Sequence, residues 1–174
     1  MTVERQNHTG DITLSIPSEE RYIYLVDIVI SHIVSEMEFG EEIRGQISLA
    51  VIEAGTNAIK HGNECDPGKT VEFCFHMEQD KLTVFVRDYG SGFDLECIEN
   101  PLVPENLMKP CGRGIFLMRS LMDQVIYSID RDCGTEVQLV KHRNSSGSQD
   151  NEGSSGYVLG SSSLLDTLAI LACA

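Results

Sequence analysis

Four polar residues recur at helical spacing within a short segment in the first half of the chain. They are Glu53, Asn57, Lys60 and His61, and an α-helix with about 3.6 residues per turn places them on successive turns of one face. A carboxylate, an amide oxygen and a cation that converge in this way suit a site for a metal ion and phosphate groups. The same pattern is also typical of the ordinary polar face of a helix, so this segment alone leaves both interpretations open.

A second polar group follows a predicted strand. Asp88 continues the inward-facing set of apolar residues over 82–86, so we expect its carboxylate on the core side, where it needs a hydrogen-bond donor. Gly90 and Gly92 come next and allow the chain to turn sharply, with backbone amides free to approach a ligand. By itself the Asp-x-Gly-x-Gly pattern is a weak signal, since many surface turns have it.

A third group opens a predicted helix. Gly112 and Gly114 flank Arg113 directly before the apolar, helically spaced segment 115–122. A helix N-terminus lined by glycines favours anions, because its backbone N–H groups and its dipole both attract negative charge. Lys109 and Arg113 are cations beside it.

The elements that position these residues follow from the hydrophobic periodicity. Strand-like alternation occurs over 12–16, 71–77, 82–86, 125–129 and 137–139, and helical spacing over 18–39, 41–61 and 112–122. This order predicts an α+β fold, a two-layer sandwich with helices on one face of a mostly antiparallel sheet. Gly62 is expected to end the second helix in the left-handed conformation. Residues 94–111 are predicted to form a long loop, of the kind that often acts as a lid.

Composition limits the classes of function. The net charge of −14 argues against direct nucleic-acid binding, because phosphate backbones need a basic surface. It favours basic partners, although the charge could equally serve solubility alone. The six cysteines lack paired spacing and no secretory signal precedes them, so we expect reduced thiols in the cytoplasm.

One folded domain is predicted over 11–143. It follows a flexible N-terminus of residues 1–10 and precedes a Ser/Gly-rich linker over 144–163. The final apolar segment, 164–174, is too short to span a membrane, so no membrane association is expected. This segment could dock on the domain or on a partner, or it could be an unstructured end.

The three motifs together are far more specific than any one of them. Their order and separation resemble the ATP-binding (GHKL) fold shared by DNA gyrase, histidine kinases and the mismatch-repair ATPases. Residues 11–143 resemble its smallest branch, the bacterial anti-sigma factor serine/threonine kinases; the tail after Arg143 is not explained by that family. The segments that carry the resemblance are Glu53-Ala-Gly-Thr-Asn-Ala-Ile-Lys-His-Gly62, Pro104-Glu-Asn-Leu107 and Gly112-Arg-Gly-Ile-Phe-Leu-Met-Arg-Ser-Leu-Met-Asp123.

The resemblance implies a role for the residues around the base and the reacting group. Asp88 would accept a hydrogen bond from the amino group of adenine, and Gly90 and Gly92 would admit the base. Asn57 would hold the Mg²⁺ that bridges the phosphates of ATP. Glu53 would be the general base that accepts the proton of the substrate serine.

The resemblance also implies which residues meet the phosphates. Gly112 and Gly114 would place backbone amides on the phosphates as the loop closes. The cations expected around these phosphates are Lys60, His61, Lys109 and Arg113.

The implied function is that of an enzyme, a serine kinase that phosphorylates a STAS-type anti-anti-sigma partner and also sequesters a sigma factor. The alternative is a nucleotide-responsive binding module of the same fold that captures its partner without phosphotransfer. Retention of Glu53 favours the kinase. A plain α+β domain with accidental motifs is the third interpretation, and the order of the three motifs argues against it. Which sigma factor and partner are bound, and whether the protein forms a homodimer, stay open.

Overall fold

The computed structural model describes residues 10–91, 113–130 and 134–143. The elements in chain order are β1 (Gly10–Pro17), the short 3-10 helix η1 (Glu20–Tyr22), α1 (Ile23–Glu36), α2 (Glu41–Asn57), the π-helical turn η2 (Ala58–Gly62), β2 (Thr70–Met77), β3 (Lys81–Arg87), α3 (Arg113–Leu121), β4 (Gln124–Asp130) and β5 (Gly134–His142).

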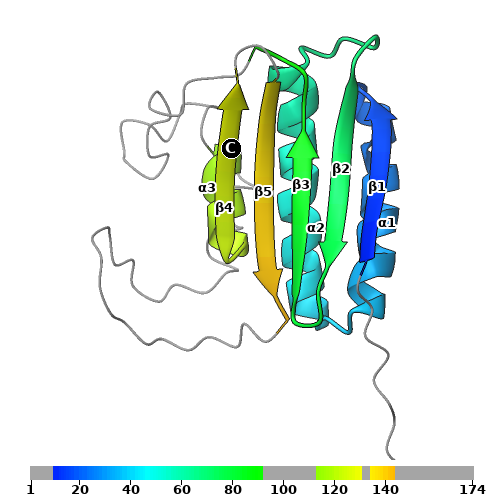
Figure 1. Cartoon of the computed structure of the whole chain (residues 1–174), viewed down its shortest axis with the longest axis vertical. Helices are drawn as coiled ribbons and strands as arrows, with labels where there is room; N and C mark the ends of the chain where they lie inside the picture. Colours follow the sequence, from blue (N-terminus) through cyan, green and yellow to red (C-terminus); the bar gives the residue numbers. More distant parts are fainter. Residues whose placement is uncertain (1–9, 92–112, 131–133, 144–174) are drawn as a thin grey trace, which may run out of the picture.

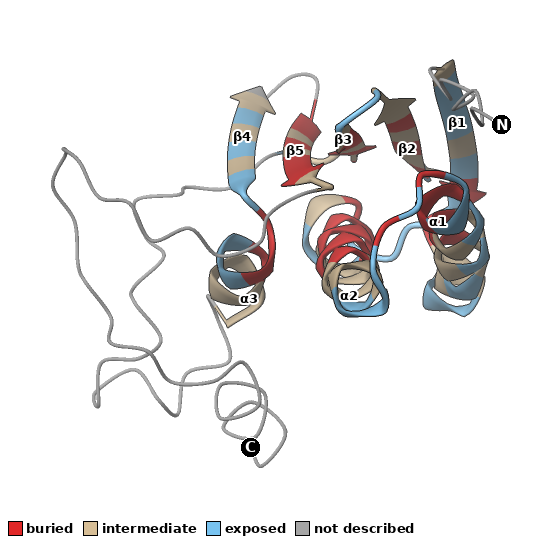
Figure 2. Ribbon diagram, turned by 90° about the horizontal axis from the view of Figure 1, so that it is seen from below, coloured by how far each residue is buried: buried red, intermediate tan, exposed pale blue. Residues whose placement is uncertain are grey.

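The strands form one sheet in the order β1-β2-β3-β5-β4, and each neighbouring pair is antiparallel. After β3 the chain continues through α3 to β4 at the edge of the sheet. The next strand, β5, then lies between β3 and β4. Figures 1 and 2 show α1, α2 and α3 packed on the same face of this sheet. The predicted two-layer α+β fold is confirmed.

The core lies between the sheet and the helices, where Figure 2 shows the buried residues gathered. Alternate residues of β2, Val71, Phe73 and Phe75, are fully buried because the strand period of two directs them all toward the helices. On α2, Ile47 and Val51 are one turn apart and meet them from the other layer. Burial of each large side chain contributes roughly 1.5–3 kcal/mol, which fixes α2 on the sheet.

The second helix ends differently from the prediction. The α-helix stops at Asn57, and residues 58–62 widen into a π-turn that the N–H of Asn63 closes on the carbonyl oxygen of Ala58 at 2.8 Å. Gly62 is not left-handed; the positive φ angles after this helix belong to Glu64 and Cys65. The prediction for Gly62 was wrong because the chain reverses only after the wider turn, and the missing side chain serves a close contact described below.

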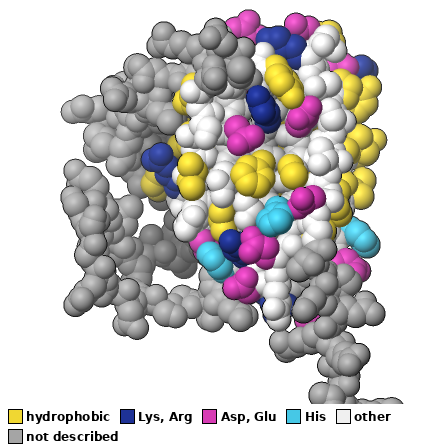
Figure 3. Space-filling view, viewed as in Figure 1, with side chains coloured by type: hydrophobic (Ala, Val, Ile, Leu, Met, Phe, Trp, Pro, Cys, Tyr) yellow, Lys and Arg dark blue, Asp and Glu magenta, His cyan; other side chains and the backbone are white. Residues whose placement is uncertain are grey.

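The opposite face of the sheet carries no helix in the part of the chain that the structure describes. Figure 3 shows hydrophobic side chains near the middle of this face, with charged and histidine side chains to either side. The strand register places one central row across the sheet, composed of Thr13, Cys74, Phe85, Gln138 and Ile126. Among the described residues, no helix is both long enough and apolar enough to cross a membrane.

The predicted domain limits remain predictions. Residues 1–9, the whole of the expected loop over 94–111, the linker over 144–163 and the tail over 164–174 lie outside the described residues.

Candidate functional site

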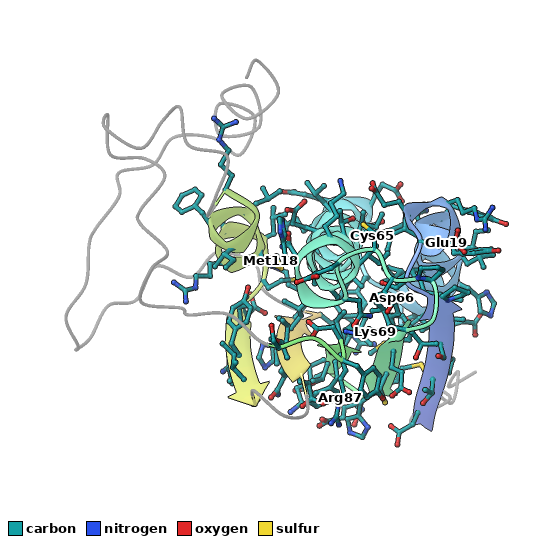
Figure 4. The ribbon with its side chains drawn as sticks, turned by 90° about the horizontal axis from the view of Figure 1, so that it is seen from above. Glu19, Cys65, Asp66, Lys69, Arg87 and Met118 are labelled. Atoms are coloured by element: carbon teal, nitrogen blue, oxygen red, sulfur yellow. The ribbon has the colours of Figure 1, made fainter. Side chains whose placement is uncertain are left out.

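Residues from all three motifs or their neighbours gather at one end of the sheet. The end of β3, the start of β5, the turn after α2 and the start of α3 meet there. Figure 4 looks onto this end, with Arg87 at the close of β3, Met118 on α3, and Cys65, Asp66 and Lys69 on the connection that leaves α2. This arrangement follows from the antiparallel order, because β3 ends where β5 begins.

Asp88 lies in the core, as the alternation of β3 predicts, with only 5% of its surface exposed. Its backbone N–H donates to the carbonyl oxygen of Thr135 at 2.9 Å. Its carboxylate Oδ1 accepts the N–H groups of Gly90 at 2.9 Å and of Thr135 at 3.1 Å. Two backbone donors therefore fix the orientation of this buried carboxylate and leave Oδ2 for another partner.

Gly62 packs directly against the Asp88 carboxylate. A methyl group on Gly62 would lie 2.2 Å from Asp88 Cγ and 2.3 Å from Oδ2, far inside contact distance. A methyl group on Gly90 would in turn lie 1.9 Å from the carbonyl oxygen of Gly62. The two glycines are thus required by close approach of the α2 turn to the segment after β3.

Thr135 is a site residue that the sequence analysis missed. It is 2% exposed, and within the described residues its hydroxyl Oγ1 has no hydrogen-bond partner although its N–H binds Asp88. A buried hydroxyl needs a partner, and the Thr135 hydroxyl beside Asp88 has the capacity to bind a ligand or a water molecule. The signal available was the alternation of β5, which places Thr135 on the inward face with Val137 and Leu139.

Asn63 is a second residue that the sequence analysis missed. Its side chain is fully buried, and its amide joins β2 to the segment after β3: Nδ2 donates to the carbonyl oxygen of Thr70 at 2.8 Å, and Oδ1 accepts the N–H of Tyr89 at 2.9 Å. A polar residue directly after the glycine of the first motif was the only signal, and it does not indicate these partners.

Glu53 and Gly114 meet where α2 and α3 pack together. A methyl group on Gly114 would lie 2.0 Å from Glu53 Oε1, so the half-buried carboxylate rests against the first turn of α3. That end of a helix favours negative charge. The structure therefore brings the first and third motifs into contact.

Asn57 is half-buried one turn after Glu53, on the last turn of α2. Lys60 and His61 follow in the π-turn and are exposed. The ammonium Nζ of Lys60 pairs with Glu20 Oε2 at 3.1 Å, on the α1 side of the molecule. The two cations thus lie in a wider turn and not on the regular α-helical face that the sequence pattern predicts. Their role at the phosphates stays a prediction.

Of the predicted phosphate-binding residues, Arg113 begins α3 and is half-buried. Gly92, Lys109 and Gly112 lie outside the described residues. Their roles also stay predictions.

The charge of Glu53 affects the pKa of Tyr127, a residue of the edge strand β4. Burial raises the pKa of Tyr127 on β4 to about 12; the positive charge of Arg119 lowers it in part, and the negative charge of Glu53 raises it. Tyr127 is therefore neutral at physiological pH and responds to the charge of Glu53.

The described residues fit a metal ion that takes few protein ligands. Among them, no group of three or more His, Cys, Asp and Glu side chains converges as a cage would. Asn57 offers a hard amide oxygen on the last turn of α2. Mg²⁺ is commonly held by one or two such groups together with water and phosphate oxygens, so this donor set suits it.

Comparison with known families gives one match over most of the chain. The model of the histidine kinase-like ATPase domain matches residues 16–141. This span contains all three motifs and every described strand except most of β1 and the last residue of β5.

Comparison with individual proteins gives relatives of similar length. The chain is 32% identical to serine-protein kinase RsbW of Listeria innocua, over 80% of this chain and 92% of that protein. It is 28% identical to serine-protein kinase RsbW of Bacillus subtilis, over 80% of this chain and 89% of that protein.

A crystal structure of the RsbU and RsbW domains of a Mycobacterium tuberculosis protein has a similar fold. The TM-score is 0.56 at 14% sequence identity, and the match covers 76% of this chain and 32% of that longer chain. At this identity the likeness concerns the fold alone.

Proposed function

This chain belongs to the histidine kinase-like ATPase family, within the bacterial anti-sigma factor serine kinases, and on that basis we propose that it binds Mg-ATP and phosphorylates a serine of a STAS-type anti-anti-sigma partner. We propose also that it sequesters a sigma factor. The observation that carries the proposal is the oriented, buried carboxylate of Asp88, at the same end of the fold as Glu53 and Asn57.

Asp88 is suited to recognise adenine. Because two backbone amides occupy Oδ1, the remaining oxygen accepts the hydrogen bond that the amino group of the base donates. The buried hydroxyl of Thr135 is the second polar group beside the base. Gly90 and Gly92 keep side chains out of the space that the base needs.

The residues expected to meet the phosphates lie on α2 and at or before the start of α3. Asn57 contributes its amide oxygen to Mg²⁺, which when bound offsets the charge of the phosphates. The backbone amides of Gly112 and Gly114, with Lys109 and Arg113, would hold the phosphates near Glu53. Because the chain has a net charge of −14, this neutralisation is essential for holding a tetra-anion.

Glu53 acts as the general base. As the serine oxygen forms its bond to the γ-phosphorus and the bond from that phosphorus to the bridging oxygen of ADP breaks, the serine proton passes to the Glu53 carboxylate. The products are phosphoserine and ADP. This reaction depends mainly on position, to which the contact between α2 and α3 would contribute by holding Glu53, and on charge neutralisation by Mg²⁺ and the cations.

The proposed partners are a sigma factor and a STAS-domain protein, and this role assigns the protein to the cytoplasm. The acidic surface suits basic partner surfaces and not nucleic acid. The second candidate is a nucleotide-responsive binding module without phosphotransfer. The presence of Glu53 against α3 favours the kinase.

A transfer assay separates the two candidates. The purified protein is incubated with γ-labelled Mg-ATP and STAS-domain proteins from its own source, and phosphoserine is located by mass spectrometry. Glu53→Ala is measured beside wild type, with ATP affinity determined by calorimetry for both. We expect transfer by wild type and none by Glu53→Ala at similar ATP affinity. Partner capture that depends on nucleotide, with no phosphoserine in either protein, would support the binding module instead.

A further inference from the structure

The buried amide of Asn63 connects two parts of the fold that the nucleotide proposal needs. Through Nδ2 it holds the carbonyl oxygen of Thr70 at the start of β2, and through Oδ1 it holds the N–H of Tyr89 after β3. Both polar atoms of the amide form hydrogen bonds, which a fully buried polar side chain needs. The connecting chain itself is pinned, because the N–H of Cys65 donates to the carbonyl oxygen of Ile59 at 2.8 Å.

The bond to Tyr89 lies next to the recognition group. Its N–H belongs to the peptide that directly follows Asp88, whose own N–H is held from the opposite side by Thr135. Asn63 and Thr135 therefore fix the backbone of Asp88 from two different elements. Gly62, the neighbour of Asn63, contacts the carboxylate as well, so the position of Asn63 bears on Asp88 through both the side chain and the main chain.

We propose that Asn63 is a positioning residue for recognition of the base. It does not touch the nucleotide; it holds Tyr89 and Gly62 so that the free oxygen of Asp88 faces the amino group of adenine. This inference rests on the proposed nucleotide function. Loss of the Asn63 bridge would let the segment after β3 shift, and the carboxylate with it.

The test compares nucleotides that differ at the recognised group. Inosine triphosphate has a carbonyl oxygen where ATP has the amino group, so the ratio of its Kd to that of ATP measures the contribution of Asp88. We expect Asn63→Ala to reduce this ratio at least about tenfold, mostly through weaker ATP binding. Asn63→Asp keeps the oxygen that accepts the Tyr89 N–H but loses the donor to the Thr70 carbonyl oxygen, so it should lower stability and still retain the ratio within about threefold.

A structural variant serves as the control. Ser48→Ala removes the hydrogen bond from Ser48 to Asp27, which joins α2 to α1 away from the site. It should lower stability and leave the ratio of the two dissociation constants unchanged. Titration calorimetry gives the fraction of competent protein separately from affinity, so partial unfolding cannot imitate the effect.

Hydrogen exchange of the wild-type protein gives a second measurement that needs no substitution. If the Asn63 bridge is coupled to base recognition, saturating ATP protects the Tyr89 amide more than saturating inosine triphosphate does. Equal protection by both nucleotides, or an unchanged ratio in Asn63→Ala, would overturn the proposal. Wild-type protein that binds neither nucleotide would instead refute the proposed function itself.

Discussion

Gly114 on α3 lies against the side chain of Glu53 on α2, at a distance where a single methyl group would stand 2.0 Å from the carboxylate Oε1. The two residues are remote in sequence, and packing of the two helices brings them together. The contact leaves room for a carboxylate and a glycine, and for nothing larger.

Gly114→Ala should therefore disturb catalysis without unfolding the protein. The added methyl meets the far end of a flexible side chain, so the Glu53 carboxylate rotates away, while alanine stabilises the helix by about 0.5–1 kcal/mol. We expect kcat for serine phosphorylation to fall by up to about 10²–10⁴-fold, the contribution that a positioned general base makes. Assays of transfer, ATP affinity and thermal unfolding check this.

The matched control for that substitution is Gly45→Ala. Gly45 is an exposed residue of α2 with no atom within 4 Å of an added methyl group. It should gain similar stability and keep full activity. Wild-type kcat in Gly114→Ala would show that the contact with Glu53 has no part in the reaction.

Asp88→Asn should weaken ATP binding while the fold persists. Asparagine can keep the oxygen that accepts the amides of Gly90 and Thr135, but it presents an amino group where the base needs an acceptor. We expect a loss of about 2–4 kcal/mol in binding, or roughly 30–1,000-fold in Kd. Calorimetry measures it, and circular dichroism checks the fold. Unchanged affinity would place the base elsewhere.

Gly62→Ala should impair both stability and nucleotide binding. The added methyl would meet the short, buried side chain of Asp88 at 2.2 Å, and two backbone hydrogen bonds prevent that side chain from moving aside. Overpacking of this kind costs about 1–3 kcal/mol. Urea unfolding and ATP titration should both change, in contrast to Gly45→Ala. Retention of wild-type stability would mean that the turn shifts freely.

Tyr127 offers a spectroscopic report on the charge of Glu53. Because burial and the Glu53 carboxylate raise the pKa of Tyr127 to about 12, Glu53→Gln should lower this pKa. The pKa of a tyrosine in the unfolded chain is 10.0, and below this pH the neutral phenol contributes its full stabilisation to the fold. That contribution is lost as the pH rises through the higher pKa of the folded state. Absorbance titration, with Tyr127→Phe as the reference, measures the shift. An identical titration in Glu53→Gln would contradict the coupling.

Asp123 should contribute an acid-sensitive part of stability. Burial by itself raises its pKa, but hydrogen bonds from the backbone and ring of His142, together with the Lys141 ammonium, lower the pKa below 3.8 overall. The Asp123 carboxylate thus contributes to stability above pH 3.8, and this contribution is lost as the pH falls through the lower pKa of the folded state.

Asp123→Asn tests that contribution. We expect it to cost about 1–3 kcal/mol of unfolding free energy near pH 7, and to lose less than wild type as the pH falls below about 4. Urea unfolding across this pH range measures both quantities. Parallel pH profiles for the two proteins would exclude Asp123 as a source of acid sensitivity.

Much of this protein could be read from local sequence patterns. Alternation over β2 and β3 and helical spacing over α2 predicted the elements and the two-layer fold, because periodicity is a property of consecutive residues. The same reasoning placed Asp88 on the core side. The glycines of the motifs marked where the chain approaches something closely, although the reason given for Gly62 was a backbone conformation that it does not adopt.

The tertiary structure alone decided which of these residues meet. The π-turn after Asn57, the pairing of Lys60 with Glu20 and the contact between Glu53 and Gly114 depend on helices packing side by side, which no local spacing specifies. Asn63 and Thr135 gained their places around Asp88 for the same reason. The pairing of β3 with β5 brings Thr135 to Asp88, and the pairing of β2 with β3 brings Thr70 and Tyr89 close enough for Asn63 to bind both.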